Sequence, residues 1–156
     1  MATQPGEWHV RWPDSDSDAE YYYSMDRFGW RIVATNSGGQ GVTISASQKA
    51  WLAKTLRDSN LPTMILVHKP FVCAGNWVDE QRLVDEELER SIQGSDEVKL
   101  ILSGHTHHSA AMSHNGTLNL VFPSTSFGIE DEPGWGVIVL HADELMAHYK
   151  RAFVEH

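Results

Sequence analysis

Two short apolar segments of this chain each lead to histidine side chains. The first ends at His68, and the second reaches His105 and His107 through Gly104, where a glycine lets the backbone bend tightly. Alternate side chains of an extended chain point to the same side, so we expect His105 and His107 to lie together. Two imidazoles on one side of a strand end are suitable ligands for a transition metal.

The apolar segments themselves are predicted to be neighbouring parallel strands. We expect strands at 64–67 and 98–102 and a helix over 79–92 between them. A helical crossover connection makes the two strands that it joins parallel. Ligands of such sheets bind at the carboxyl ends of the strands, so the three histidines would converge on one point.

The rest of the pattern indicates an α/β fold with a mixed sheet. Two early strands are joined near Gly29, Ser45 and Gln48 have the spacing of a capping box, and Asn115-Gly116 is typical of a hairpin turn that would expose His114. The other expected elements are a helix at 45–59 and strands at 21–25, 31–34, 109–112, 118–122, 135–141 and 145–153. Residues 1–19 are expected to form an irregular N-terminal arm, and residues 20–156 the folded part.

Composition limits the functional classes. The chain has 156 residues, enough for one domain with a core, and a net charge of −9, which disfavours nucleic-acid and anionic membrane surfaces as partners. Cys73 is its one cysteine, so no internal disulfide is expected and a cytoplasmic location fits. No signal peptide is recognisable, and no apolar run is long enough to cross a bilayer.

An ordered set of motifs between residues 21 and 153 resembles the calcineurin-like metallophosphoesterases. Members of that family have a strand that ends in His followed by Pro, and a later Gly-His-x-His. The matching segments here are the strands at 21–26 and 30–37, the helix start Ser47-Gln48-Lys49-Ala50-Trp51-Leu52, His68-Lys69-Pro70 and Gly104-His105-Thr106-His107. The fold implied is part of a metallophosphoesterase β-sandwich, with mixed sheets flanked by helices.

The resemblance implies a metal-dependent phosphoester hydrolase of the phosphodiesterase or phosphatase type. His68 and His105 would bind the second metal ion of the family's site and His107 the first, and metal-activated water would attack phosphorus. The ions compatible with such ligands are Mn, Fe, Zn, Ni and Co. The partner would be a small phosphoester, with phosphodiesters favoured over monoesters. His108 would point away from His107, and we assign it as the proton donor.

The chain departs from the family in its first half. The family's Asp-x-His, Gly-Asp and Gly-Asn-His-Asp motifs are absent, so the chain looks like the C-terminal half of the domain. Three imidazoles without a bridging carboxylate should not hold two ions about 3.5–4 Å apart, so we expect one ion rather than two. The candidate replacement ligands are His9, Asp14, Asp16 and Asp18.

Three explanations of the missing motifs remain open. The chain could be a truncation with one metal and weak hydrolysis, a second chain could complete the site, or the chain could be an inactive folded remnant. A functional alternative from another class is a non-catalytic, metal-stabilised oligomerisation module. A half-domain would also expose sheet edges and apolar faces, so we expect a homodimer or higher oligomer.

Overall fold

A computed structural model describes residues 22–37, 44–71, 83, 85–125, 133–141 and 145–151, the last of these by backbone alone. The strands are β1 (Tyr23–Arg27), β2 (Trp30–Ala34), β3 (Thr63–Leu66), β4 (Val98–Ser103), β5 (Ala110–His114), β6 (Thr117–Val121), β7 (Gly134–Leu140) and β8 (Leu145–Arg151). The helices are α1 (Ala46–Arg57) and α3 (Glu86–Gln93). Neither of these helices has the length and apolar character needed to span a membrane.

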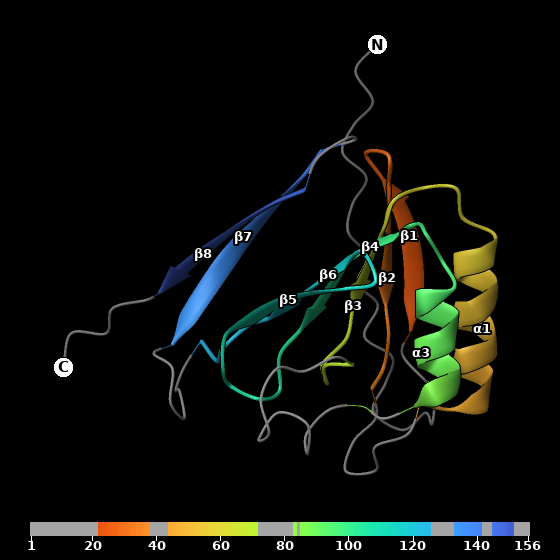
Figure 1. Ribbon diagram of the computed structural model, residues 1–156, viewed down its shortest axis with the longest axis horizontal. Coiled ribbons are helices and arrows are strands. Elements are labelled where there is room, and N and C mark those ends of the chain that lie inside the picture. The colour runs from red at the N-terminus through yellow and green to blue at the C-terminus, as the bar shows by residue number, and fades with distance from the viewer. Residues whose placement is uncertain are drawn as a thin grey trace, which may run out of the picture.

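The strands form a mixed sheet and a separate hairpin (Figure 1). The large sheet has six strands in the order β1-β2-β3-β4-β6-β5, in which β2, β3, β4 and β6 run parallel and the two edge strands pair antiparallel. β7 and β8 pair antiparallel in the second sheet. The mixed α/β architecture expected from the sequence is confirmed, including the parallel pairing of β3 with β4.

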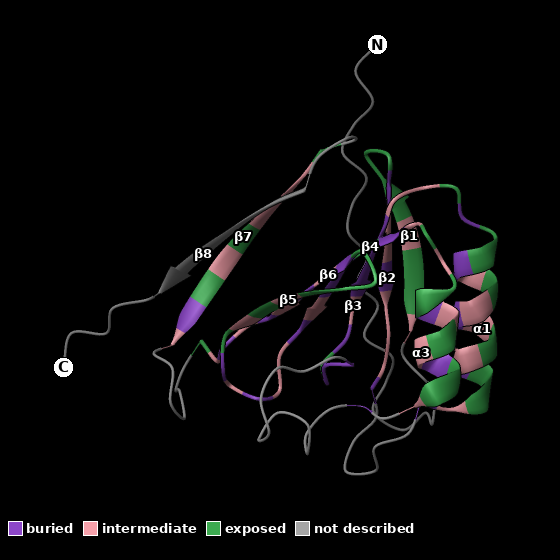
Figure 2. Ribbon diagram, in the orientation of Figure 1, coloured by how far each residue is buried: buried purple, intermediate pink, exposed green. Residues whose placement is uncertain are grey.

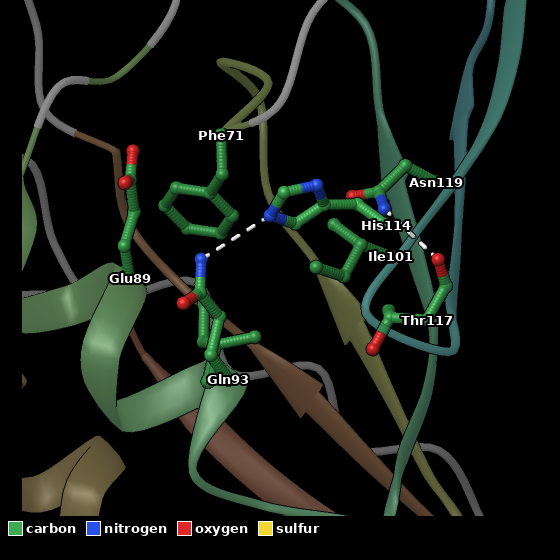
Figure 3. Close-up of a pocket in the computed structure, with 8 residues that line it drawn as sticks. Phe71, Glu89, Gln93, Ile101, His114, Thr117 and Asn119 are labelled. Carbon is green, nitrogen blue, oxygen red and sulfur yellow. Dashed lines mark hydrogen bonds between the residues drawn. The ribbon is translucent and has the colours of Figure 1, made fainter.

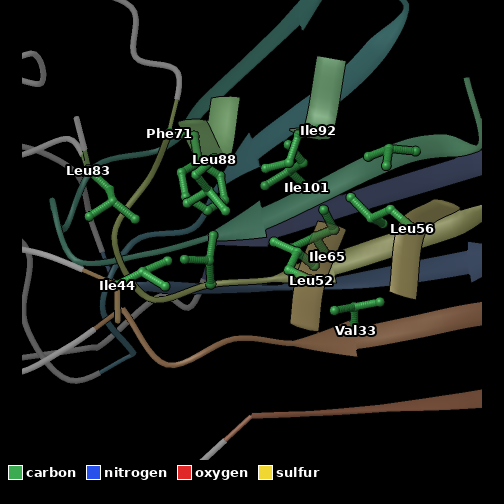
Figure 4. Packing of buried hydrophobic residues seen from close by; sticks show 12 residues of the cluster. Val33, Ile44, Leu52, Leu56, Ile65, Phe71, Leu83, Leu88, Ile92 and Ile101 are labelled. Atoms are coloured by element: carbon green, nitrogen blue, oxygen red, sulfur yellow. The ribbon is translucent and has the colours of Figure 1, made fainter. Parts of the chain in front are cut away.

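α1 and α3 lie side by side against one face of the large sheet, with their exposed residues turned outward (Figures 1 and 2). Leu52 and Leu56 of α1 and Leu88 and Ile92 of α3 are buried, as helical periodicity requires. Figure 4 shows these side chains packed around Ile65 of β3. Other members of this core cluster are Val33, Ile44, Val67, Phe71, Leu83, Val98 and Ile101.

The opposite face of the sheet carries a second, smaller cluster. Trp30, Met64 and Leu100 are buried there, and five neighbouring side chains of the large sheet are only partly buried, namely Ile32, Leu66, Leu102, Leu118 and Leu120. β7 covers part of this face with Ile138 and Leu140. The indole N–H of Trp30 donates to the backbone carbonyl of His141 at 2.9 Å and ties the hairpin to the sheet.

Helix α3 begins later than the sequence pattern predicts. The expected helix over 79–92 is wrong at its start, because Leu83 and Asp85 are not helical and the Asp85 side chain accepts a hydrogen bond from the backbone N–H of Leu88 at 3.1 Å. A side chain in this position caps a helix N-terminus by satisfying a backbone donor that the helix leaves unpaired. Residues 79–82 and 84 lie outside the described part.

The hairpins β1–β2 and β5–β6 close with turns of the same geometry. Phe28 and Gly29 have φ of 51° and 80°, and Asn115 and Gly116 have φ of 50° and 81°. Two-residue hairpin turns with both φ values positive favour Asn-Gly. Asn115-Gly116 follows this preference, as expected, and His114 beside it is exposed. Phe28 departs from the preference and is 98% exposed.

Replacing Phe28 with asparagine is therefore expected to stabilise the chain. Left-handed backbone costs most side chains about 1–2 kcal/mol and asparagine less, so the free energy of unfolding should rise by roughly 0.5–1 kcal/mol. The reciprocal change, Asn115→Phe, should lower it by a similar amount. Urea denaturation of the two variants measures both effects. Unchanged or lower stability in Phe28→Asn would contradict the expectation.

Candidate metal centre

The candidate centre lies where β3 and β4 end side by side. The backbone N–H of Val67 donates to the Leu102 carbonyl at 3.0 Å, and beyond the strands the N–H of Gly104 donates to the His68 carbonyl at 3.0 Å. These bonds carry the parallel pairing past the last strand residues. They also fix the backbone of His68 next to the start of the turn that carries His105.

The imidazoles of His68 and His105 face each other at this edge. His105 Nδ1 and His68 Nε2 are 3.2 Å apart, and the ring centroids are 5.0 Å apart with the planes at 72°. When two imidazole nitrogens bind the same ion at about 2.0–2.1 Å, and the angle between them at the ion is about 90–110°, the nitrogens are roughly 2.9–3.4 Å apart. The observed separation fits a shared ion, and it also permits a hydrogen bond between complementary tautomers.

A strained turn presents His105. Its φ is 69°, and the N–H of Thr106 donates to the carbonyl of Gly104 at 2.8 Å, which closes a γ-turn with His105 at its centre. A γ-turn with positive φ at the central residue is rare and strained, and such conformations cluster at functional sites. His107 also has a positive φ, of 58°. The sharp bend is therefore made at the histidines, whereas Gly104 has no positive φ.

This turn corrects one part of the sequence reasoning. Because β4 ends at Ser103 and the chain then turns, the alternation of an extended strand does not apply to His105 and His107. Within the part of the chain that the structure describes, no three His, Cys, Asp or Glu side chains gather as a set of metal ligands. His68 and His105 are brought together, and the His107 side chain is not grouped with them.

The surroundings favour a neutral imidazole at His105. Burial lowers its pKa, and the charges of His68, Lys69 and His107 lower it further. The neutral ring is the form that binds a metal ion. Thr106, which follows His105, is 2% exposed, and its hydroxyl makes no hydrogen bond to the described residues. A buried hydroxyl without a hydrogen-bond partner costs about 1–3 kcal/mol, so a polar group that binds next to Thr106 would be stabilised by pairing with it.

Gln48 and Ser37 support the site through hydrogen bonds, although the sequence did not predict a role for them there. The Gln48 side chain pairs with the backbone of Asn36, accepting from its N–H at 2.7 Å and donating to its carbonyl at 2.8 Å. The next residue, Ser37, accepts a hydrogen bond from the N–H of Lys69 at 3.2 Å. α1 is thus connected through the end of β2 to the turn that carries His68.

This arrangement revises the expected capping box. Ser45 does accept from the backbone N–H of Gln48, at 3.2 Å, which is the first half of the motif. Gln48 directs its side chain to Asn36 rather than back to the start of its own helix. The signal that could have indicated this role is the position of Gln48 at the start of α1, directly after the loop that follows β2.

Comparison with known proteins identifies relatives of the chain. It is 31% identical over 136 residues to a probable cyclic nucleotide phosphodiesterase of Synechococcus sp., in a match that covers 80% of the chain and 51% of that protein. It is 30% identical over 136 residues to a 3′,5′-cyclic-nucleotide phosphodiesterase of Nostoc sp., covering 77% of the chain and 51% of that protein. No family model matches the chain.

Solved structures share the fold. A dimetal phosphatase of Danio rerio has a TM-score of 0.57 at 14% identity, over 73% of this chain and 51% of that one. A purple acid phosphatase of yellow lupin, Lupinus luteus, has a TM-score of 0.51 at 18% identity, over 65% of this chain and 22% of that one. The chain is a relative of the calcineurin-like metallophosphoesterases. It spans about half the length of the curated relatives that it matches.

The structure describes only one of the other candidate site residues of this metallophosphoesterase relative, namely His108. His9, Asp14, Asp16 and Asp18 lie outside the described residues. His108 is buried, at 7% exposure.

Two hollows differ in what they could hold. One, on the helix-covered side, is lined by Phe71, Gln93, His114 and Asn119 among others (Figure 3), and its volume of about 20 Å³ is enough for about one water molecule. The other lies at the strand ends beside His68, is open to solvent and measures about 300 Å³. Small-molecule sites start at about this size, whereas the first hollow is too small for one.

Proposed function

We propose that this chain is part of a metal-dependent phosphoester hydrolase that prefers phosphodiesters. The observation that carries the proposal is the His68–His105 pair, with its nitrogens 3.2 Å apart at two adjacent strand ends. The printed names of the two curated relatives, both cyclic nucleotide phosphodiesterases, support the substrate class. The net charge of −9 favours small phosphoesters over nucleic acids as substrates.

The chain's own residues have separate roles in this proposal. His68 and His105 would hold a divalent transition metal. His107, which the structure does not group with this pair, would become a further ligand by turning its side chain toward the ion. When bound, the ion would lower the pKa of a coordinated water and offset negative charge on the phosphoryl oxygens. His108, which follows the γ-turn, would donate a proton to the leaving group.

The remaining ligands would be carboxylates or imidazoles from outside the described residues. His9, Asp14, Asp16 and Asp18 of the arm over 1–19 are the candidates in this chain, and another chain is the alternative source. We propose one ion rather than two, from among Mn, Fe, Zn, Ni and Co, with residues 20–156 acting as the C-terminal half of the domain. A cytoplasmic location is part of the proposal and rests on the single cysteine, Cys73.

Metal content per chain, measured on untagged protein together with hydrolysis of bis-p-nitrophenyl phosphate and cyclic nucleotides in added Mn²⁺, tests this function. We expect close to one ion per chain and metal-dependent turnover. Protein that binds no metal and hydrolyses none of these substrates would contradict the proposal. Phosphomonoester hydrolysis alone would refute the preference for diesters.

A metal-stabilised oligomerisation module is the second candidate, and the half-covered sheet face favours it. Leu118 and Leu120 are among side chains that the β7–β8 hairpin leaves only partly buried, and β1 is an exposed edge strand. A homodimer that covers this face would remove apolar surface from water. Light scattering would detect the dimer. An ion held by four protein ligands, without turnover, would favour this candidate, because catalysis requires an open coordination position.

A further inference from the structure

Lys69 is an unusually buried lysine directly after His68. It is 9% exposed, and no carboxylate among the described residues is paired with it. Other cationic side chains among the described residues do form ion pairs with carboxylates. Lys49 lies 3.2 Å from Asp85 and 2.9 Å from Glu87. The charge of Lys69 therefore lies next to His68 without a counterion among the described residues.

The backbone of Lys69 is held in place. Its N–H donates to Ser37 Oγ at 3.2 Å, Ser37 itself is 3% exposed, and Pro70 restricts the backbone of Lys69, which precedes it. The Lys69 ammonium is not among the fully buried atoms that lack a partner, so its stem is buried while its charged end keeps contact with solvent. This charge also contributes to the lowered pKa of His105, so its field reaches the imidazole pair.

We propose that Lys69 binds a non-bridging oxygen of the phosphoryl group beside the His68–His105 pair. The inference rests on the proposed function and adds a substrate-binding residue to it. An ammonium is a compact charge that binds phosphate oxygens through charge-assisted hydrogen bonds. A phosphate located there would supply the counterion that the described residues do not provide.

Binding of inorganic phosphate tests the inference without requiring turnover. Isothermal titration calorimetry should show at least about tenfold weaker binding in Lys69→Met, and binding within about threefold of the original in Lys69→Arg, which keeps the charge. Lys99→Met is the matched control, since Lys99 is exposed on β4 and its Nζ donates to the backbone carbonyl of Asp96 at 2.6 Å. This variant removes the same charge and should bind phosphate as the original chain does.

Metal content, measured on the same samples, separates this inference from the proposed function. Lys69→Met should keep the metal content of the original chain, because Lys69 is not a ligand. Unchanged phosphate binding in Lys69→Met, equal losses in Lys69→Met and Lys99→Met, or no phosphate binding by the original chain would each overturn the inference. Loss of metal together with phosphate would also overturn it, because Lys69 would then act through the structure of the site. A chain that binds phosphate through Lys69 but holds no metal would refute only the proposed function.

Discussion

Replacing His105 with alanine is expected to abolish metal binding and phosphodiester hydrolysis together. The pair at the ends of β3 and β4 supplies two nitrogens 3.2 Å apart, and loss of one leaves a single imidazole to hold the ion. We expect metal affinity to fall by at least about 100-fold, since even partners that only orient metal ligands contribute 10–100-fold. Dialysis against a metal buffer followed by metal analysis gives the affinity, and an assay at fixed Mn²⁺ gives the turnover.

Two further variants make this test specific. His105→Asn removes the imidazole but tolerates the left-handed backbone of the γ-turn, so it separates loss of a ligand from loss of the turn. His114→Ala is the control, because His114 is exposed, contacts Gln93 at 3.3 Å and pairs with Thr117 at the opposite end of the strands from His105. Full metal binding by both His105 variants would contradict the assignment, as would an equal loss in His114→Ala.

Replacing Gln48 with leucine is expected to cost about 1–3 kcal/mol of stability. Gln48 is 2% exposed and hydrogen-bonds to both backbone groups of the half-buried Asn36, and each of the two bonds lost contributes about 0.5–1.5 kcal/mol. Urea denaturation measures the loss. The exposed Gln93→Leu is the matched control and should change stability by less than about 0.5 kcal/mol. A stable Gln48→Leu would show that the Asn36 groups find other partners.

Gln48→Glu is expected to make the stability of the folded chain depend on pH. The carboxylate can accept from the Asn36 N–H but is repelled by the Asn36 carbonyl, so burial and repulsion should raise the pKa of the new carboxyl in the folded chain. Only the protonated form can donate to the carbonyl. A folded pKa above the unfolded one contributes stability at low pH that is lost as the pH rises through the folded value. Stability relative to the original chain should therefore be higher at pH 5 than at pH 7.5.

The sequence predicts the neighbouring ends of β3 and β4 because two simple patterns agree. Short apolar segments separated by a helix predict parallel strands, and His68 and His105 directly follow those segments. The conformation after Gly104 could not be predicted in this way. Positive φ is uncommon for any residue other than glycine, so the values at His105 and His107 could not be predicted from the motif alone.

The role of Gln48 is hidden from sequence for a related reason. The capping-box rule considers only residues of the same helix, so it assigns the Gln48 side chain to the start of α1. Asn36 competes for that side chain because its N–H and carbonyl come to the same place once β2 packs against α1. Such competition between a local and a distant partner is decided by the assembled fold.

If an ion binds the paired histidines, their distance along the chain would link metal supply to the lifetime of the protein. His68 and His105 are 37 residues apart and meet only when β3 and β4 have paired. An ion that binds this pair and not the unfolded chain stabilises the native state by mass action, by about 2.7 kcal/mol at a free concentration 100-fold above its Kd. Proteases act on the unfolded fraction, so metal starvation would lower the abundance of the chain as well as its activity.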